Sequence, residues 1–350
     1  MKIITVNASK TYDVKIGQSL LDTAGKELRR LSKAKKIAVV TDSNVEKFYL
    51  SRLMESLRQE AFEICSFVFP AGEASKNAET YLRLTRFLAK EHLTRSDLVV
   101  ALGGGVTGDL AGFAAATYLR GVDFVQIPTS LLAMVDSSVG GKTAIDLPEG
   151  KNLVGAFYQP LLVLCDIDLL NSLPRENFLD GCGEIVKYGV LGDGNLLSIL
   201  KEEGLSFPRE SVIARCVEMK RDIVNADEFE CGTRQLLNLG HTLGHAVEAK
   251  SDFRLTHGCA VAIGLAVVTR ASVKLGYCKK EDGEMILAAL TALGLPADTE
   301  YSVEDLFSAM LSDKKRSGDT ITCVLPRGIG NCIREKMTFS QLKEFMEAGM

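Results

Sequence analysis

The chain has 350 residues, of which 46% are hydrophobic and 25% charged, and its formal net charge at pH 7 is -4. This composition is typical of a folded globular protein with room for two domains, and the slight negative charge gives no general attraction to nucleic acid or anionic membranes. No segment approaches the roughly 18 uninterrupted apolar residues of a membrane span, and the amino terminus lacks a secretory signal pattern, so we expect a cytoplasmic protein with neither nucleic acid nor membrane as partner.

The first half of the chain alternates apolar, β-rich segments with amphipathic helical ones. Strands are predicted at 36–42, 61–69, 97–102, 124–128 and 161–166. Helical periodicity lies between several of them, including 43–59 and 78–91. This alternation predicts an α/β domain with a mainly parallel, Rossmann-like sheet.

A glycine-rich loop, Gly-Gly-Gly-Val-Thr-Gly-Asp at 103–109, follows the strand at 97–102 and begins a helix. Backbone amides and the helix dipole at such a point can receive a pyrophosphate. The loop matches G-x-G-x-x-G but lies in a later βα unit than a Rossmann fingerprint does, so a simple tight turn is the alternative. Asp42, which ends an earlier strand, could bind a ribose, favouring NAD over NADP, or could cap a helix.

The segment Gly140-Gly141-Lys142-Thr143 is similar to the end of a Walker A loop. A P-loop needs glycine five residues before Gly141, where Asp136 stands, so residue identity excludes it. The turn either presents Lys142 to an anion or leaves it in solvent.

Helical patterns dominate the chain after Pro174. Helices are predicted at 177–190, 208–225, 233–249, 258–275 and 281–293, and one strand at 320–325. We therefore predict two domains, 1–174 with the α/β sheet and 175–350 mainly helical.

Three of the four histidines, His241, His245 and His257, lie close together in the sequence, downstream of Glu184. Imidazole and carboxylate groups hold zinc and similar ions, and a catalytic site uses three such ligands, which two histidines and one glutamate would supply. His241 and His245 share one helix face, so they are either paired ligands or ordinary helix histidines. A zincin site is excluded because the segment reads His-Thr-Leu-Gly-His, without the required glutamate.

Five segments together closely resemble the 3-dehydroquinate synthase family, in order and with sensible spacing between about residue 35 and about residue 326. They are GGGVTGDLAGFAAATYLRG at 103–121, IPTSLLAMVDSSVGGKT at 127–143, KNLVGAFYQP at 151–160, EIVKYG at 184–189 and LNLGHTLGHA at 237–246.

The resemblance implies conversion of 3-deoxy-D-arabino-heptulosonate 7-phosphate to 3-dehydroquinate and phosphate, a carbon-oxygen lyase reaction and the second step of the shikimate pathway toward chorismate and the aromatic amino acids. It implies transient oxidation by NAD, phosphate elimination, re-reduction, ring opening and an intramolecular aldol step, assisted by one Zn²⁺ or Co²⁺ ion. A homodimer is also implied.

The resemblance assigns the metal to Glu184, His241 and His257, and turns His245 toward the substrate phosphate. Its candidates for NAD binding are Asp42, Gly72, Glu73, Lys76, Gly105, Val106, Thr107, Gly108, Asp109, Thr129, Ser130, Lys142, Lys151, Leu169, Leu170, Asn171 and Ser172. The phosphate-side candidates are Lys142, Asn152, Lys187, Asn238, His245 and one of Lys314 or Lys315. Lys220 and Arg234 match the carboxylate side, Asp136 helps to orient ligands, and Arg120 matches an arginine donated across the dimer interface.

The chain departs from the family pattern at Cys182 and Gly183, where the family more often has a larger residue and alanine, and at Leu239 and Cys259. These departures concern local packing and metal preference. The alternatives are another sugar-phosphate cyclase, which would differ at the carboxylate site, and a metal-dependent NAD polyol dehydrogenase, which would release NADH.

Overall fold

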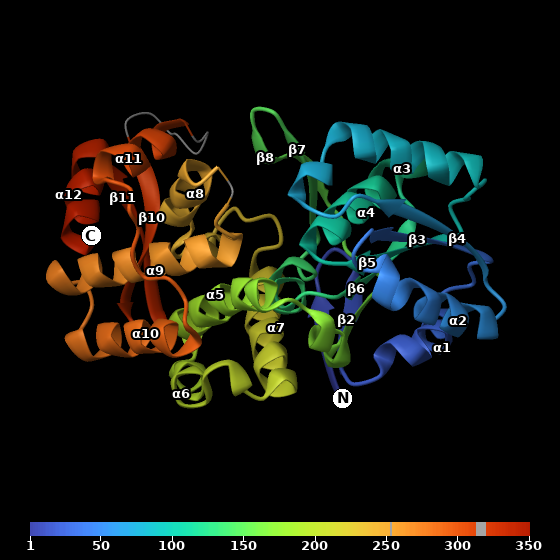
Figure 1. The fold of residues 1–350 in the computed structure, drawn as a ribbon, viewed down its shortest axis with the longest axis horizontal. Helices are drawn as coiled ribbons and strands as arrows, with labels where there is room; N and C mark the ends of the chain where they lie inside the picture. Colours follow the sequence, from blue (N-terminus) through green and yellow to red (C-terminus); the bar gives the residue numbers. More distant parts are fainter. Residues whose placement is uncertain (253, 313–319) are drawn as a thin grey trace. The chain divides into compact units, whose positions relative to one another are not determined.

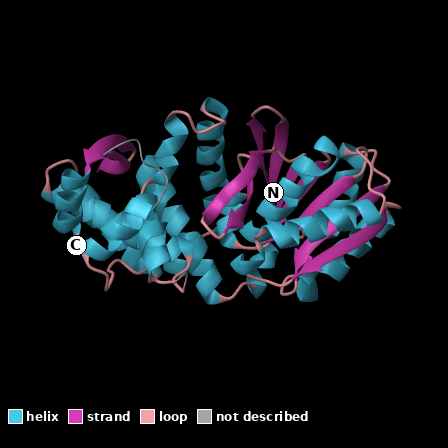
Figure 2. Ribbon diagram, turned by 90° about the horizontal axis from the view of Figure 1, so that it is seen from above, coloured by secondary structure: helices cyan, strands magenta, loops and turns pink. Residues whose placement is uncertain are grey.

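The computed structural model describes residues 1–252, 254–312 and 320–350. Contacts divide the chain into two compact units: Met1–Pro174 with Arg209–Phe229, and Arg175–Pro208 with Glu230–Met350. The first unit contains a sheet with helices around it, and the second unit is mainly helical (Figures 1 and 2). Lys314 and Lys315, predicted for the phosphate side, lie outside the described residues.

The first unit is built on a seven-stranded sheet whose strand order is β1-β2-β9-β6-β5-β3-β4. The strands are β1 (Lys2–Asn7), β2 (Thr11–Gly17), β3 (Lys36–Asp42), β4 (Glu63–Phe69), β5 (Leu98–Gly103), β6 (Asp123–Pro128) and β9 (Leu162–Asp166). Every pairing is parallel except that of the edge strand β1 with β2. The central strands are buried from end to end because helices cover both faces, which confirms the predicted Rossmann-like, mainly parallel sheet.

The helices of the first unit connect and cover these strands. They are α1 (Leu20–Leu31), η1 (Glu46–Leu50), α2 (Ser51–Gln59), η2 (Glu73–Ser75), α3 (Ala78–Lys90), α4 (Gly105–Thr117), η3 (Tyr118–Arg120), η4 (Ala133–Ser137), η5 (Ile167–Ser172) and α7 (Arg209–Ala226). An antiparallel hairpin of β7 (Lys142–Leu147) and β8 (Gly150–Phe157) was not predicted. Because β8 is largely exposed, its sequence lacks the apolar alternation of a half-buried strand.

Helix α7 does not belong to the unit in which the predicted division at Pro174 places it. The prediction puts its residues in the helical domain, whereas the contacts place them in the first unit. Asn225 accepts a hydrogen bond from the amide of Asn7 in β1, at 2.9 Å. Lys220 donates to the carbonyl of Asp136 in η4, at 2.7 Å. These long-range contacts, which no local pattern encodes, decide the assignment.

The second unit is mainly helical, as predicted. Its elements are α5 (Arg175–Gly192), α6 (Gly194–Glu203), η6 (Gly204–Ser206), η7 (Thr233–Asn238), α8 (His241–Lys250), α9 (His257–Lys274), α10 (Lys280–Leu293), α11 (Val303–Ser312), β10 (Thr320–Gly328), β11 (Asn331–Thr338) and α12 (Phe339–Gly349). Helix α9 is buried on most of its faces and forms the centre of this unit. Within the described residues, no helix combines the length and apolar character needed to cross a membrane.

Two predictions for this unit are corrected. The predicted helix at 233–249 breaks at Gly240, whose φ of 78° is a left-handed conformation that glycine adopts without strain. A Cβ atom there would also lie 3.0 Å from the carbonyl oxygen of Val261 in α9. The strand predicted at 320–325 does not stand alone, because β11 pairs with it in an antiparallel hairpin.

Candidate metal and cofactor sites

The predicted metal ligands meet within the second unit, each from a different helix. Oε1 of Glu184 in α5 lies 3.3 Å from Nε2 of His241 in α8 and 3.4 Å from Nε2 of His257 in α9. Two ligand atoms bound at 2.0–2.1 Å to one tetrahedral zinc ion lie about 3.3 Å apart. The separations and the chemistry of these donors therefore fit a divalent metal ion.

A second donor set shares two of these residues. Among the described residues, the imidazoles of His241, His245 and His257 each offer a nitrogen within 4.8 Å of the others. The ring centroids of His241 and His245 are 5.4 Å apart, with the planes nearly perpendicular. Geometry alone therefore allows either Glu184 or His245 as the third ligand.

Burial and neighbouring charge set the ionisation of this cluster. Burial would raise the pKa of Glu184, but the ammonium of Lys187, which contacts the carboxylate, and the imidazole of His241 hold that pKa well below its usual range. Burial and the charge of Lys187 lower the pKa of His241. For His257, hydrogen bonds to Glu184 and Glu248 outweigh burial and raise the pKa to about 10. The cluster is thus an anionic carboxylate surrounded by potential cations.

Close contact between two helix backbones brings Glu184 and His257 together. A Cβ atom on Gly183 would lie 2.1 Å from the carbonyl oxygen of Gly258, and one on Gly258 would lie 1.7 Å from that of Asp180. Both positions therefore require glycine. Helices α5 and α9 thus approach each other here more closely than a side chain at either position would allow.

Replacing Gly183 with alanine is expected to separate α5 from α9, because the new methyl group would overlap backbone atoms that cannot move independently. Overpacking of this kind costs about 1–3 kcal/mol of unfolding free energy. We expect lower stability in denaturant unfolding and weaker Co²⁺ binding. Gly276→Ala is a poor control because its φ is 77°, whereas Glu202→Ala, at an exposed position in α6, leaves the contact intact. Unchanged stability and Co²⁺ affinity would contradict the packing argument.

The predicted cofactor residues of the first unit gather at the carboxyl ends of its parallel strands. β3 leads through α2 to β4 on one side, whereas β5 pairs with β3 on the other side and leads to β6. Such a switch in strand order opens a crevice that binds ligands in this class of fold. Asp42 ends β3, and the glycine loop follows β5. Gly104 is the N-cap of α4 and has no side chain to cap the helix. The first backbone amides of α4 can therefore bind an anion.

Asp42 holds the turn after β3, and its binding of a ribose stays a prediction. Its Oδ1 accepts hydrogen bonds from the amides of Asn44 and Val45, at 2.9 and 3.1 Å, just before η1, whose N-cap is Val45. Its Oδ2 lies 3.4 Å from the hydroxyl of Thr107 in the glycine loop. The carboxylate thus connects both loops at the crevice.

Two further groups of cofactor candidates adjoin these loops. The amide of Thr129, after β6, donates to the carbonyl of Gly103 at 3.0 Å. The hydroxyl of Tyr49 donates to the carbonyl of Leu169 at 2.9 Å and lies 2.5 Å from the hydroxyl of Ser172. Gly72, which has a φ of 111° and open space at its Cβ position, precedes η2 after β4. These predicted NAD loops therefore all follow the carboxyl ends of parallel strands of the same sheet.

Lys76 connects the cofactor candidates to a phosphate-side candidate. Its side chain is 5% exposed, and its Nζ lies 2.6 Å from Oδ2 of Asp109. It also donates to Oδ1 of Asn152 at 2.5 Å. Asn152 has a left-handed φ of 55°, and its amide donates to Asp146 at 2.7 Å. Burial lowers the pKa of Lys76, but Asp109 and Glu73 together raise it above its ordinary value.

The other substrate candidates of the first unit have different surroundings. Lys220 lies 3.0 Å from Oδ1 of Asp136, so these two predicted residues form an ion pair. Lys142 is exposed at the start of β7 and follows Gly140 and Gly141, both with positive φ. Arg120 is exposed and has a left-handed φ of 64°. Its predicted place at a dimer interface stays a prediction.

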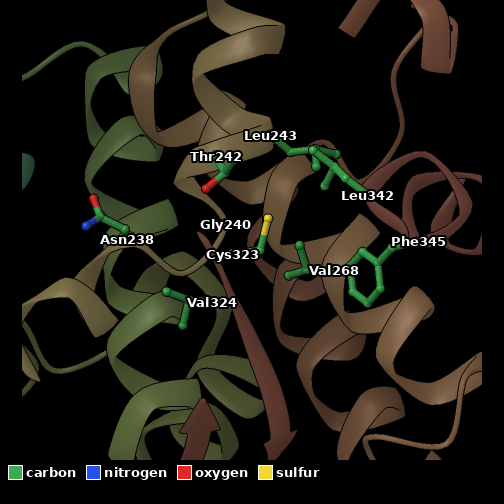
Figure 3. A pocket seen from close by; sticks show the side chains of 9 residues that line it. All are labelled: Asn238, Gly240, Thr242, Leu243, Val268, Cys323, Val324, Leu342 and Phe345. Carbon is green, nitrogen blue, oxygen red and sulfur yellow. The ribbon is translucent and has the colours of Figure 1, made fainter. Parts of the chain in front are cut away.

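In the second unit, Asn238 and Arg234 lie on η7, immediately before the histidine-bearing helix α8. Arg234 is 1% exposed. The side chain of Asn238 donates a hydrogen bond through Nδ2 to Oε1 of Glu230, at 3.0 Å. A small cavity also touches Asn238, but its other lining residues are mostly apolar (Figure 3): Gly240, Thr242, Leu243, Val268, Cys323, Val324, Leu342 and Phe345. None of the predicted metal ligands lines it.

One buried carboxylate beside the histidines was not predicted. Oε2 of Glu248 in α8 lies 3.3 Å from Nδ1 of His257. Its position two turns after His241 on the same helix was the available signal, because residues spaced in this way share a helix face.

The chain matches two family models, described as 3-dehydroquinate synthase N-terminal over residues 66–180 and 3-dehydroquinate synthase C-terminal over residues 181–316. It is 46% identical over 346 residues to the 3-dehydroquinate synthase of Paracoccus denitrificans (strain Pd 1222), with 94% of each chain covered.

Solved structures of related proteins have the same fold. A 2-deoxy-scyllo-inosose synthase complexed with carbaglucose-6-phosphate, NAD⁺ and Co²⁺ is 24% identical, with a TM-score of 0.91 and complete coverage of both chains. A 2-epi-5-epi-valiolone synthase from Streptomyces hygroscopicus subsp. jinggangensis 5008, with NAD⁺ and Zn²⁺ bound, is 26% identical, with a TM-score of 0.89, and the match covers 99% of this chain and 97% of that one.

Proposed function

The chain belongs to the 3-dehydroquinate synthase family and catalyses the reaction of that family, a carbon-oxygen lyase reaction on a phosphorylated substrate, and we propose how its residues divide the work. The substrate is 3-deoxy-D-arabino-heptulosonate 7-phosphate, and the products are 3-dehydroquinate and phosphate. The observation that carries the proposal is the placement of Glu184 Oε1 at metal-ligand spacing from two imidazoles.

We assign the metal ion to Glu184, His241 and His257, and NAD to the loops after β3, β4, β5, β6 and β9. When bound, the two groups supply Lewis-acid polarisation of hydroxyl oxygens and reversible acceptance of a hydride. The relatives with NAD⁺ and Co²⁺ or Zn²⁺ support this assignment. We prefer Glu184 to His245 as the third ligand because Oε1 of Glu184 lies close to the Nε2 atoms of both His241 and His257.

The protein's own contribution is cationic and positional. The substrate carries a carboxylate and a phosphate, and the chain itself is slightly acidic, so local cations must neutralise both groups. We assign the carboxylate to Lys220 and Arg234. The phosphate is assigned to Lys142, Asn152, Lys187, Asn238 and His245. Preorganised charges of this kind stabilise the anionic leaving group without rearrangement during the reaction.

The exposed Arg120 supports a homodimer in which this side chain reaches the partner. Its left-handed φ costs about 1–3 kcal/mol in an ordinary residue, so the surroundings must hold it in this conformation.

The proposal is tested by supplying the purified protein with the heptulosonate phosphate and a catalytic amount of NAD. We expect phosphate release equal to substrate consumed, with no accumulation of NADH at its absorbance maximum, because the hydride returns in each turnover. Stoichiometric NADH would indicate a polyol dehydrogenase instead. Phosphate release only from glucose 6-phosphate or sedoheptulose 7-phosphate would indicate a different sugar-phosphate cyclase.

A further inference from the structure

Glu248 is a buried carboxylate that lies beside His257, one of the proposed metal ligands. It is 4% exposed, and its Oε2 lies 3.3 Å from Nδ1 of His257. A carboxylate this deeply buried is costly unless it accepts hydrogen bonds or pairs with a cation. The opposite nitrogen of the same imidazole, Nε2, faces Oε1 of Glu184 at 3.4 Å.

The two histidines of the proposed metal site are restrained in the same way. Nδ1 of His241 lies 3.1 Å from the carbonyl oxygen of Leu239. Each ring can therefore donate its Nδ1–H to an oxygen, which leaves Nε2, on the side of Glu184, to bind the ion. An imidazole binds a metal through a nitrogen that carries no proton, so the partner at Nδ1 decides which tautomer is held and how the ring is turned.

Both histidines need such a restraint, because His241 is the first residue of α8 and His257 is the first residue of α9. No preceding turn of the same helix packs against either ring. The backbone beside His257 is held by Asp180, which accepts a hydrogen bond from the amide of Gly258 at 2.5 Å. That contact places the Cα atom of His257, and only a contact to the ring itself can set its rotation.

We propose that Glu248 is a positioning residue for metal binding: it accepts a hydrogen bond from Nδ1 of His257 and so presents Nε2 to the ion. The proposal rests on the metal site assigned above. It adds a residue that touches neither substrate nor metal. Because Glu248 lies on α8 and His257 on α9, the contact also ties together the two helices that supply the histidine ligands.

The test measures Co²⁺ binding to the metal-free protein, by competition with a chromophoric chelator and by the visible absorption bands of bound Co²⁺. The variants are Glu248→Ala and Glu248→Gln, with Glu284→Gln as control, an exposed glutamate in α10. Removal of an outer partner of a metal-bound histidine typically weakens metal binding about 10–100-fold. We expect this loss for Glu248→Ala, with altered Co²⁺ bands, and a smaller loss for Glu248→Gln, whose amide oxygen still accepts from Nδ1–H.

The outcomes separate this proposal from the one on which it rests. Thermal unfolding of each metal-free variant shows whether it is folded, and Glu248→Gln keeps the test decisive if the alanine variant is not. Wild-type Co²⁺ affinity and bands in the folded variants, with one Co²⁺ bound by wild type, would overturn the role of Glu248 alone. A wild-type protein that binds no Co²⁺ would overturn the metal assignment and this inference together.

Discussion

Glu184→Gln is expected to abolish turnover and metal binding and to destabilise the metal-free protein. The amide cannot supply the negative charge that the metal and both imidazoles face. It also leaves the ammonium of Lys187, 1% exposed, without the carboxylate that it contacts. Removing one partner of a buried ion pair costs about 3–5 kcal/mol. Co²⁺ competition and denaturant unfolding of the metal-free protein measure the two effects.

A double variant separates the two causes. In Glu184→Gln/Lys187→Met no buried charge of the pair remains, so we expect stability to recover while Co²⁺ binding stays lost, because replacing a whole buried pair is often nearly neutral. Glu176→Gln, an exposed position on the same helix, is the control. Retention of wild-type Co²⁺ affinity in Glu184→Gln would favour His245 as the third ligand.

Lys76→Met is expected to destabilise the first unit by about 3 kcal/mol at neutral pH, because it removes the buried ammonium that neutralises the largely buried Asp109. It also removes the donor to Asn152, whose left-handed backbone this contact helps to hold. The exposed Lys90→Met in α3 is the matched control, since it changes the same charge without breaking a buried contact.

The unfolding free energy that Lys76→Met loses should be greater at higher pH. Burial already raises the pKa of Asp109, against the opposing effect of Lys76. Without Lys76, the folded-state pKa rises further above the unfolded value of about 3.9. A raised folded-state pKa gives stability that is present below the unfolded pKa and lost as pH rises through the folded pKa. Urea unfolding at about pH 5 and about pH 8 should therefore show the larger deficit at the higher pH. Equal deficits would contradict this account.

Much of the fold could be predicted from local sequence. The strands at 36–42, 97–102 and 161–166 are apolar runs because both faces of the sheet are covered, and burial of that kind is visible in the residues themselves. The glycine loop likewise follows its strand and begins its helix as predicted. The family resemblance, carried by ordered motifs, supplied the candidate site residues.

Elements that depend on distant partners could not be predicted in this way. The exposed hairpin β7–β8 has no core-facing pattern, and β11 is defined by its pairing with β10. Helix α7 reads as one more amphipathic helix, and only its contacts with β1 and η4 place it in the first unit.

The sequence by itself determined the residue types: glycines where a turn needs them, and a glutamate with histidines suited to a metal. Tertiary structure alone decided their distances. The backbone contact of Gly183 with Gly258 brings Glu184 beside His257, Glu248 reaches the ring of His257 from another helix, and Lys76 joins Asp109 to Asn152. The physical reason is that hydrophobic periodicity encodes which face of an element is buried, whereas a close contact between two elements depends on the shapes and charges of both.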